Sequence, residues 1–224
     1  MRPSSGTVRR ARPLLDTLVD IRISGALRHA LPALERAFAA IERVHRAMSA
    51  QESTSDIARL RSGRRCALDP WTRRVLDRAE EIRQATDGLF DCAACDYALD
   101  GIAKGFAVDR AVECLQDAGI PHGVVNAGGD LRVFGDAFED IHVRMPHEPA
   151  RLLYVGCVRN AAIATSASAG LVDPLATARR SRAAGATVIA SDCMSADALT
   201  KPCMLEPVKA EKLTSRFGAK AIVL

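Results

Sequence analysis

The sequence predicts an α+β fold in which several helices pack against a largely antiparallel sheet. In the first half of the chain, apolar residues recur at spacings of three and four, which is typical of amphipathic helices. In the second half, short apolar segments typical of antiparallel strands follow one another, which favours α+β over a doubly wound parallel sheet. The chain has 224 residues, 48% of them apolar, so it is long enough to bury a core.

The first half contains one predicted strand and four predicted helices. The strand lies at the end of residues 14–24, where Val19, Ile21 and Ile23 alternate with other residues. Asp69 and Pro70 suit the N-cap and first helical positions of the third helix. The predicted helices cover residues 27–48, 57–60, 69–88 and 105–118.

The second half is predicted to be mostly strands joined by short turns. A further helix begins at Ser195, and residues 166–186, rich in Ala, Ser and Arg, form the predicted loop. The predicted strands cover residues 122–126, 130–134, 141–145, 152–158, 161–165, 187–190 and 221–224.

The charge of the chain is modest and unevenly placed. The net charge is +4, and much of it comes from residues 1–13, which we expect to form a disordered basic arm. Such an arm is usually solvated, and the alternative is an interaction module that binds nucleic acid or a membrane surface. The one Trp, two Tyr and six Phe do not interleave with the basic clusters, so we expect no nucleic-acid partner.

Several features bear on the compartment. No apolar run approaches the roughly 18 residues that span a membrane, so we expect no membrane span. No apolar segment of the signal-peptide type follows the first arginines, which favours the cytoplasm, with the periplasm as the alternative if the true N-terminus carries a signal. The seven cysteines are scattered, which indicates reduced thiols. Cys92 and Cys95 form a CxxC without a second one, so we expect a structural or incidental role for them.

Three glycine- and acid-containing blocks lie at the joints between predicted strands and helices. They are residues 99–110, 126–132 and 187–201. Glycines let a backbone approach a ligand closely, and a lysine or a helix N-terminus can then contact phosphates. Lys104 lacks the Walker A spacing, so a P-loop is rejected. Together the blocks predict a phosphate-rich ligand held with a metal ion.

Asp197 and Thr200 are the candidate metal ligands. They lie three residues apart on one predicted helix, so their side chains share a face. Oxygen ligands of this kind suit Mg²⁺, which also binds substrate phosphates. The alternative interpretation is a helix start in which Ser195 and Asp197 cap backbone N–H groups.

The three blocks, in this order, resemble the ApbE family of FAD:protein FMN transferases. Three weaker stretches agree. Residues 48–60 are similar to the family's early serine-rich loop, residues 86–91 to its T-x-G-x-F-D turn, and residues 162–166 to its A-x-A-T-S strand end. The similarity spans roughly residues 15–224, so we expect a single domain over residues 14–224.

The resemblance implies an ApbE-like, T-fold-like α+β fold that binds FAD with Mg²⁺ and transfers FMN to a Ser or Thr of an acceptor protein. By position it implies catalytic roles for Asp197 and Lys104. It implies metal ligands at the Gly101 carbonyl, Asp197 and Thr200. The residues implied to bind the flavin nucleotide are Met48, Ser49, Lys104, Asn126, Gly128, Gly129, Asp130, Thr165 and Ser166.

The chain departs from the family's pattern at several positions. The family's Asp-x-x-x-Thr metal motif would place threonine at Lys201, so either Thr200 substitutes as the ligand or Lys201 places its own charge near the phosphates. The family's His-His pair would fall at Ala169 and Gly170, and Gln51 replaces an aromatic residue. A missing histidine removes a candidate proton acceptor. The alternative to an active transferase is therefore an FAD-binding protein of the same fold with impaired catalysis.

Overall fold

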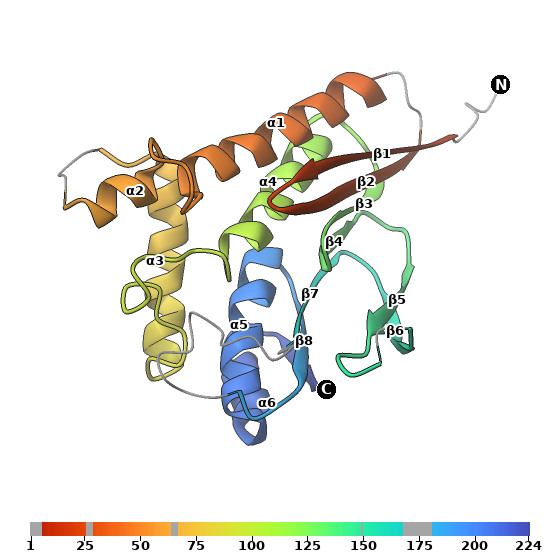
Figure 1. Cartoon of the computed structure of the whole chain (residues 1–224). Coiled ribbons are helices and arrows are strands. Elements are labelled where there is room, and N and C mark those ends of the chain that lie inside the picture. Colours follow the sequence, from red (N-terminus) through yellow and green to blue (C-terminus); the bar gives the residue numbers. More distant parts are fainter. Residues whose placement is uncertain (1–5, 26–28, 64–66, 149, 168–180) are drawn as a thin grey trace.

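A seven-stranded antiparallel sheet forms the centre of the molecule (Figure 1). The computed structural model describes residues 6–25, 29–63, 67–148, 150–167 and 181–224. The strands of the sheet, in spatial order, are β1 (Gly6–Leu14), β2 (Thr17–Gly25), β3 (His122–Ala127), β4 (Asp130–Phe134), β7 (Ala161–Ala167), β8 (Gly185–Ala190) and β9 (Lys220–Val223). Each neighbouring pair is antiparallel, as the sequence predicts.

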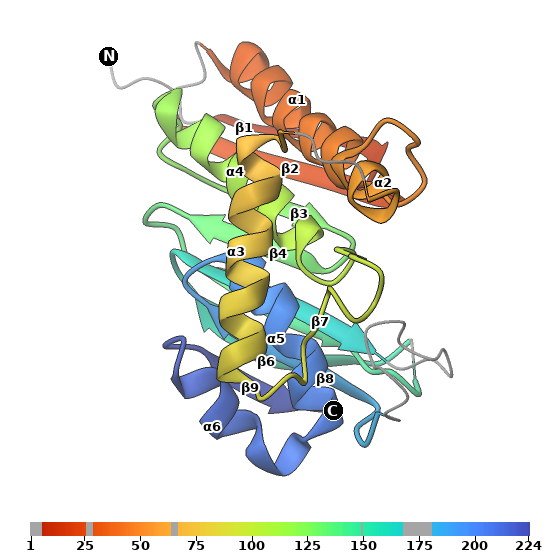
Figure 2. The same cartoon turned by 90° about the vertical axis from the view of Figure 1, so that its left-hand side faces the viewer.

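The helices cover one face of this sheet, and a small hairpin covers part of the other (Figure 1). The hairpin is β5 (Glu139–Arg144) and β6 (Leu152–Val158). The helices are α1 (Ala30–Met48), α2 (Asp56–Arg61), α3 (Pro70–Ala85), α4 (Ala103–Asp117), α5 (Cys193–Leu205), the short 3₁₀ helix η1 (Pro207–Lys209) and α6 (Ala210–Ser215). Turned by 90°, the molecule shows α3 running across α4 and α5 (Figure 2).

The main core lies between the sheet and α1, α4 and α5. Phe38 and Phe106 enter it from the helices, and Val125 and Val188 enter it from the sheet; all four are at most 1% exposed. Burial of this apolar surface is the main force that fixes α4 and α5 on the sheet. A smaller cluster on the opposite face, which includes Ile141 and Ile163, holds the β5–β6 hairpin.

Residues 6–13 form part of a strand, so the disordered basic arm predicted from the sequence is wrong for them. β1 pairs with β2 along its whole length. The connecting turn places Leu15 and Asp16 at φ values of 56° each, a conformation that sequence patterns signal through Asn-Gly or Asp-Gly. Leu-Asp gives no such signal. Arg9 and Arg12 of β1 make ion pairs, that of Arg9 with Asp20 at 2.7 Å, and residues 1–5 lie outside the described ranges.

Other predicted elements are present with shifted ends. The helix predicted from Ser195 begins at Cys193. The first residues of the predicted loop 166–186 belong to strand β7, and its last residues belong to strand β8. Residues 168–180 of that loop lie outside the described part of the chain. α6 was not predicted. Within the described ranges, no helix is long and apolar enough to cross a membrane.

Candidate functional site

A cavity of about 460 Å³ opens where four parts of the chain meet. They are the β1–β2 turn, the last turns of α1 with the residues after it, the start of α4 and the β3–β4 turn. The lining residues are Leu15, Asp16, Thr17, Val44, His45, Met48, Ser49, Gln51, Asp100, Ala103, Lys104 and Gly128. The volume falls in the range of small-molecule sites, and apolar walls with a few polar groups are typical of such sites.

The β3–β4 turn presents backbone to this cavity. Gly128 and Gly129 have φ values of +67° and +107°, a region that side-chain-bearing residues rarely adopt. A Cβ at Gly128 would lie 2.5 Å from Thr17 Oγ1, so the turn also packs directly against β2. Asn126 Oδ1 accepts a hydrogen bond of 2.9 Å from the Gly129 N–H and fixes the turn. These contacts explain why the β3–β4 turn has asparagine at position 126 and glycine at positions 128 and 129.

Two ion pairs lie close to the cavity, which one of their members, Lys104, lines; three of the four side chains come from helices and one comes from the sheet. Lys104 Nζ, from α4, lies 3.1 Å from Asp130 Oδ2 on β4. Lys201 Nζ lies 2.9 Å from Asp197 Oδ1, one turn apart on α5. The Gly105 N–H donates to Asp197 Oδ2 at 3.3 Å, which places this carboxylate at the N-terminus of α4. We refer to Lys104, Asp130, Asp197 and Lys201 as the charged cluster.

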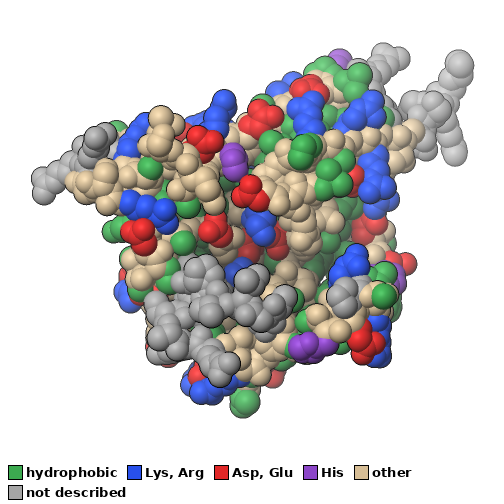
Figure 3. Space-filling model, in the orientation of Figure 1, with side chains coloured by type: hydrophobic (Ala, Val, Ile, Leu, Met, Phe, Trp, Pro, Cys, Tyr) green, Lys and Arg blue, Asp and Glu red, His purple; other side chains and the backbone are tan. Residues whose placement is uncertain are grey.

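The cluster is buried at its carboxylates and open at Lys104. The side chains of Asp197 and Asp130 are 2% and 5% exposed, whereas that of Lys104 is 35% exposed. Lys104 also lines the cavity, so it connects the cluster to the ligand space. On the face shown in Figure 3, acidic and basic side chains lie next to one another in the region below α1.

Burial and neighbouring charge change the protonation of the cluster. Burial and the charge of Asp197 raise the pKa of Asp130 to about 7, against the lowering effect of Lys104 and Lys201. Burial acts to lower the pKa of Lys104, but the carboxylates of Asp130 and Asp197 outweigh it and the pKa is raised. Lys104 therefore stays charged at neutral pH, and the Asp130 carboxyl exchanges its proton near that pH.

Gly105 sets the distance between α4 and α5. A Cβ at this position would lie 2.2 Å from the Cys193 carbonyl oxygen and 2.9 Å from Met194 Cα. Both are backbone atoms, which side-chain movement cannot relieve. The absence of a side chain at Gly105 thus brings the N-terminus of α4 against α5 and lets its N–H contact Asp197.

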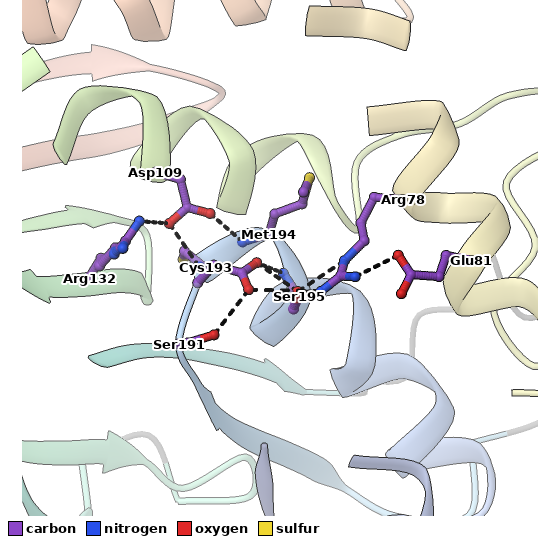
Figure 4. Close-up of polar contacts among 9 residues, drawn as sticks. Arg78, Glu81, Asp109, Arg132, Ser191, Cys193, Met194 and Ser195 are labelled. Carbon is purple, nitrogen blue, oxygen red and sulfur yellow. Dashed lines mark hydrogen bonds and ion pairs between the residues drawn. The ribbon is translucent and has the colours of Figure 1, made fainter. Parts of the chain in front are cut away.

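A second polar cluster fixes the N-terminus of α5 (Figure 4). Asp109 accepts hydrogen bonds of 2.9 Å from the N–H groups of Cys193 and Met194, and Arg132 Nη1 donates to it at 2.8 Å. Asp192 is the N-cap and accepts from the Ser195 N–H. The alternative in which Ser195 and Asp197 cap this helix is therefore wrong.

Arg78 of α3 donates to Ser195 Oγ at 2.7 Å, which links α3 to the same helix end. A second cavity, of about 490 Å³, lies beside this cluster and is lined by charged side chains of both signs, including Arg78, Asp109 and Arg132. Since these groups bind one another and the backbone of α5, we assign the cluster a positioning role for the α5 residues Asp197 and Lys201.

Hydroxyl groups contact one another between β7 and its neighbours α5 and β8, close to Asp197. Ser166 Oγ lies 2.8 Å from Thr200 Oγ1, and Thr165 Oγ1 lies 2.9 Å from Thr187 Oγ1. The Thr200 hydroxyl also donates to the Asp197 carbonyl at 2.7 Å. None of these residues lines the cavity around Lys104.

The structure therefore brings the sequence-predicted residues together only in part. Met48, Ser49, Lys104 and Gly128 line the cavity, and Asp130 and Asp197 adjoin it through the charged cluster. Gly101 is buried immediately before α4. Sequence patterns do not mark the cavity residues Asp16, Thr17 and His45, which come from a turn, a strand start and a helix end without a motif of their own, whereas Asp100 lies within the predicted block 99–110 but was not singled out.

Neither CxxC residue lines this cavity. Cys92 is buried, and burial, with smaller contributions from Cys95 and Asp91, raises the pKa of its thiol to about 12. A protonated thiol is neither a metal ligand nor a nucleophile. The described residues contain no group of three or more His, Cys, Asp or Glu side chains that would hold a metal ion.

Comparison with known proteins identifies the family. The model of the ApbE family matches residues 15–98 and 94–223, nearly the whole chain. The chain belongs to the ApbE family. Members of this family are flavin transferases. No protein among the curated sequences matches the chain closely enough to be counted as a relative.

Solved ApbE structures share the fold. The flavin transferase ApbE from Vibrio cholerae superposes with a TM-score of 0.82 at 18% identity, over 98% of this chain and 93% of that one. The apo flavinyl transferase ApbE of Pseudomonas stutzeri gives 0.81 at 16%, over 97% and 90%. The ApbE protein of Thermotoga maritima gives 0.83 at 20%, over 97% and 94%.

The metal ion that the ApbE resemblance implies does not fit the residues at its expected position. Both Asp197 oxygens already have donors, Lys201 Nζ and the Gly105 N–H, and the Thr200 hydroxyl is engaged with Asp197 and Ser166. Two like unit charges 4 Å apart repel by about 4 kcal/mol at an effective dielectric constant of 20, and a divalent ion doubles this. The Lys201 ammonium therefore opposes Mg²⁺ at Asp197. Residues 169 and 170, where the family's histidines would fall, lie outside the described ranges.

Proposed function

We propose that this chain binds FAD and transfers its FMN half to a Ser or Thr hydroxyl of an acceptor protein. The observation that carries the proposal is the position of Lys104, which lines the cavity and belongs to the buried charged cluster. A ligand that fills the cavity would meet an ammonium group and an exposed-backbone glycine turn at one end. Such groups suit the diphosphate of a dinucleotide.

The apolar part of the cavity suits the rest of the ligand. Val44, Met48 and Leu15 supply apolar surface on the side of α1 and the β1–β2 turn. A flavin ring is large and flat, so burial against such side chains contributes most of its binding free energy. Ser49 and Thr17 supply hydroxyl groups in the cavity lining that would fix its orientation.

The transfer step balances without an oxidant or reductant. The acceptor hydroxyl oxygen attacks the phosphorus of the FMN half, and a new P–O bond forms. The bond from this phosphorus to the bridging oxygen breaks, and AMP leaves with the electron pair. The charge that builds on the phosphoryl oxygens is stabilised by fixed cations, here Lys104.

The hydroxyl proton needs an acceptor within the site. His45, Asp16 and Asp100 are the titratable groups besides Lys104 among the cavity-lining residues. An imidazole is a suitable general base near neutral pH. We therefore assign the proton to His45.

A direct assay tests the proposal. The full chain is incubated with FAD and a Thr-containing peptide, with and without Mg²⁺, and mass spectrometry detects a covalent FMN adduct while chromatography detects released AMP. We expect adduct and AMP in equal amounts, both strongly reduced in Lys104→Met. FAD binding without either product supports the impaired FAD-binding protein instead, and an absence of FAD binding refutes both functions.

A further inference from the structure

The carboxylate expected to bind a divalent ion already has a cation of this chain's own. Lys201 Nζ lies 2.9 Å from Asp197 Oδ1, and the two side chains are 13% and 2% exposed. The (i, i+4) spacing on α5 puts both on one helix face, so the pair is built into the helix. A lysine ammonium carries three N–H donors, of which Asp197 takes two, one through Oδ1 at 2.9 Å and one through its carbonyl oxygen at 3.5 Å.

The second carboxylate of the cluster also forms an ion pair, but its Oδ2 accepts no hydrogen bond from the described residues. Lys104 Nζ contacts Asp130 Oδ2 at 3.1 Å, so the two carboxylates face two ammonium groups. The formal charge of the cluster is zero when all four groups are ionised. Nothing in this balance calls for a divalent cation, whereas a carboxylate pair without Lys201 would leave a net negative charge.

Thr200, another expected metal ligand, already uses its hydroxyl group in contacts within the protein. Thr200 stands three residues after Asp197, and it donates its hydroxyl to the Asp197 carbonyl oxygen and contacts Ser166 Oγ. It is 0% exposed. The next position, where the family's pattern has threonine, is Lys201 itself. A single substitution thus replaces a neutral oxygen ligand by a positive charge.

We propose that Lys201 takes the place of the divalent cation and binds the ligand's diphosphate together with Lys104, so that the chain binds its dinucleotide without a metal ion. The identity of the dinucleotide rests on the function proposed above. The exclusion of a divalent ion at Asp197 does not rest on that function, because it follows from the ion pair between Lys201 and Asp197 alone. Lys201 supplies one positive charge where a divalent metal supplies two. It is part of helix α5, however, so no ion has to be bound from solution before the ligand binds.

The first test measures metal binding without any nucleotide. Mn²⁺, a paramagnetic substitute for Mg²⁺, is titrated into the wild type, Lys201→Thr and Lys212→Thr, and free Mn²⁺ is followed by electron paramagnetic resonance. Lys212 is an exposed lysine of α6 and serves as the matched control. We expect no Mn²⁺ binding to the wild type or to Lys212→Thr, and one bound ion in Lys201→Thr. A wild type that binds Mn²⁺ as well as Lys201→Thr overturns the proposal.

The second test measures FAD affinity by fluorescence in EDTA and in Mg²⁺. We expect the wild type to bind equally in both buffers. Because a charge-assisted hydrogen bond to the diphosphate is lost, Lys201→Thr should bind FAD on the order of tenfold or more weakly in EDTA. Mg²⁺ should restore this loss. A wild type that requires Mg²⁺ for binding contradicts the proposal.

The two tests separate this inference from the proposed function. If FAD binds to no variant in either buffer, the proposed function fails, and the Mn²⁺ titration still decides whether Lys201 excludes a divalent ion. If the wild type binds FAD only with Mg²⁺, the function stands and the inference fails. Circular dichroism spectra of the three proteins establish whether each is folded. If Lys201→Thr does not fold, the Mn²⁺ and FAD measurements on the wild type still decide the question.

Discussion

Lys104 Nζ lies 3.1 Å from Asp130 Oδ2 and joins the start of α4 to the start of β4 beside the cavity. Asp130 is 5% exposed and Lys104 is 35% exposed, so the pair has one buried and one accessible end. The same lysine thus has two roles that can be measured separately. It neutralises a buried carboxylate, and it offers its charge to a ligand.

Replacing Lys104 by methionine should weaken both roles. FAD affinity should fall on the order of tenfold, and the unfolding free energy by about 1–3 kcal/mol because a buried carboxylate loses its partner. Adding Asp130→Asn should recover much of the stability but none of the affinity. Urea unfolding and FAD titration of both variants check this, with Lys212→Thr as the control. A double variant as unstable as Lys104→Met would contradict the ion-pair account.

Replacing Gly105 by alanine should disturb the junction of α4 and α5. The new Cβ would meet the Cys193 backbone, and overpacking of this kind costs about 1–3 kcal/mol or more. The Asp197 contact with the Gly105 N–H should lengthen, and FAD affinity should fall too. Gly218→Ala is the control, because a Cβ there meets nothing within 4 Å and adds only the strain of φ +62°. Equal losses in the two variants would refute a close-approach role for Gly105.

The stability of the chain should depend on pH through Asp130. Its pKa is raised to about 7 in the folded chain, so the folded state binds this proton more tightly than the unfolded state. The contribution is fully present below a pH of about 4 and is lost as the pH rises through about 7. Relative to Asp130→Asn, the wild type should lose more than about 1.4 kcal/mol over this window, the equivalent of one pKa unit.

Urea unfolding of the two proteins at several pH values measures this loss. Asp136→Asn, at an exposed position, is the control and should run parallel to the wild type. If the curves of the wild type and Asp130→Asn also run parallel, Asp130 titrates alike in the folded and unfolded states.

Replacing His45 by glutamine should slow FMN transfer while leaving FAD affinity unchanged. His45 lines the cavity at the end of α1, and loss of a general base costs on the order of a hundredfold or more in rate. The assay compares kcat and the FAD dissociation constant of His45→Gln with those of His147→Gln, an exposed histidine outside the site. Unchanged kcat in His45→Gln would assign the proton to another group, such as Asp16 or Asp100.

Much of the fold follows from local sequence patterns. The helices α1, α3 and α4 and most strands carry clear apolar periodicities, and Asp69 caps α3 as predicted, accepting from the Trp71 N–H at 2.8 Å. β1 escaped prediction because its partner and its Leu15-Asp16 turn, not its own pattern, make it a strand. Pairing between strands is a tertiary effect, which local patterns carry only weakly.

The candidate site was predictable in part for a similar reason. Glycine turns and helix starts at Asn126–Asp130 and Ala103–Gly105 mark the backbone that surrounds a ligand. The β1–β2 turn and His45 belong to the cavity only because distant segments fold together. The (i, i+4) spacing of Asp197 and Lys201 on a helix is visible in the sequence and is compatible with an ion pair. The hydrogen bond from the Gly105 N–H and the burial of both side chains depend on how α4 packs against α5, so only the structure shows them.

The position of FAD in a crystal structure of its complex with this chain tests the central claim most directly. The account predicts a diphosphate within hydrogen-bond distance of Lys104 Nζ and a flavin or adenine ring against Met48 and Val44. A dinucleotide bound in the second cavity near Arg78 and Arg132, with the cavity around Lys104 left to solvent, would contradict it.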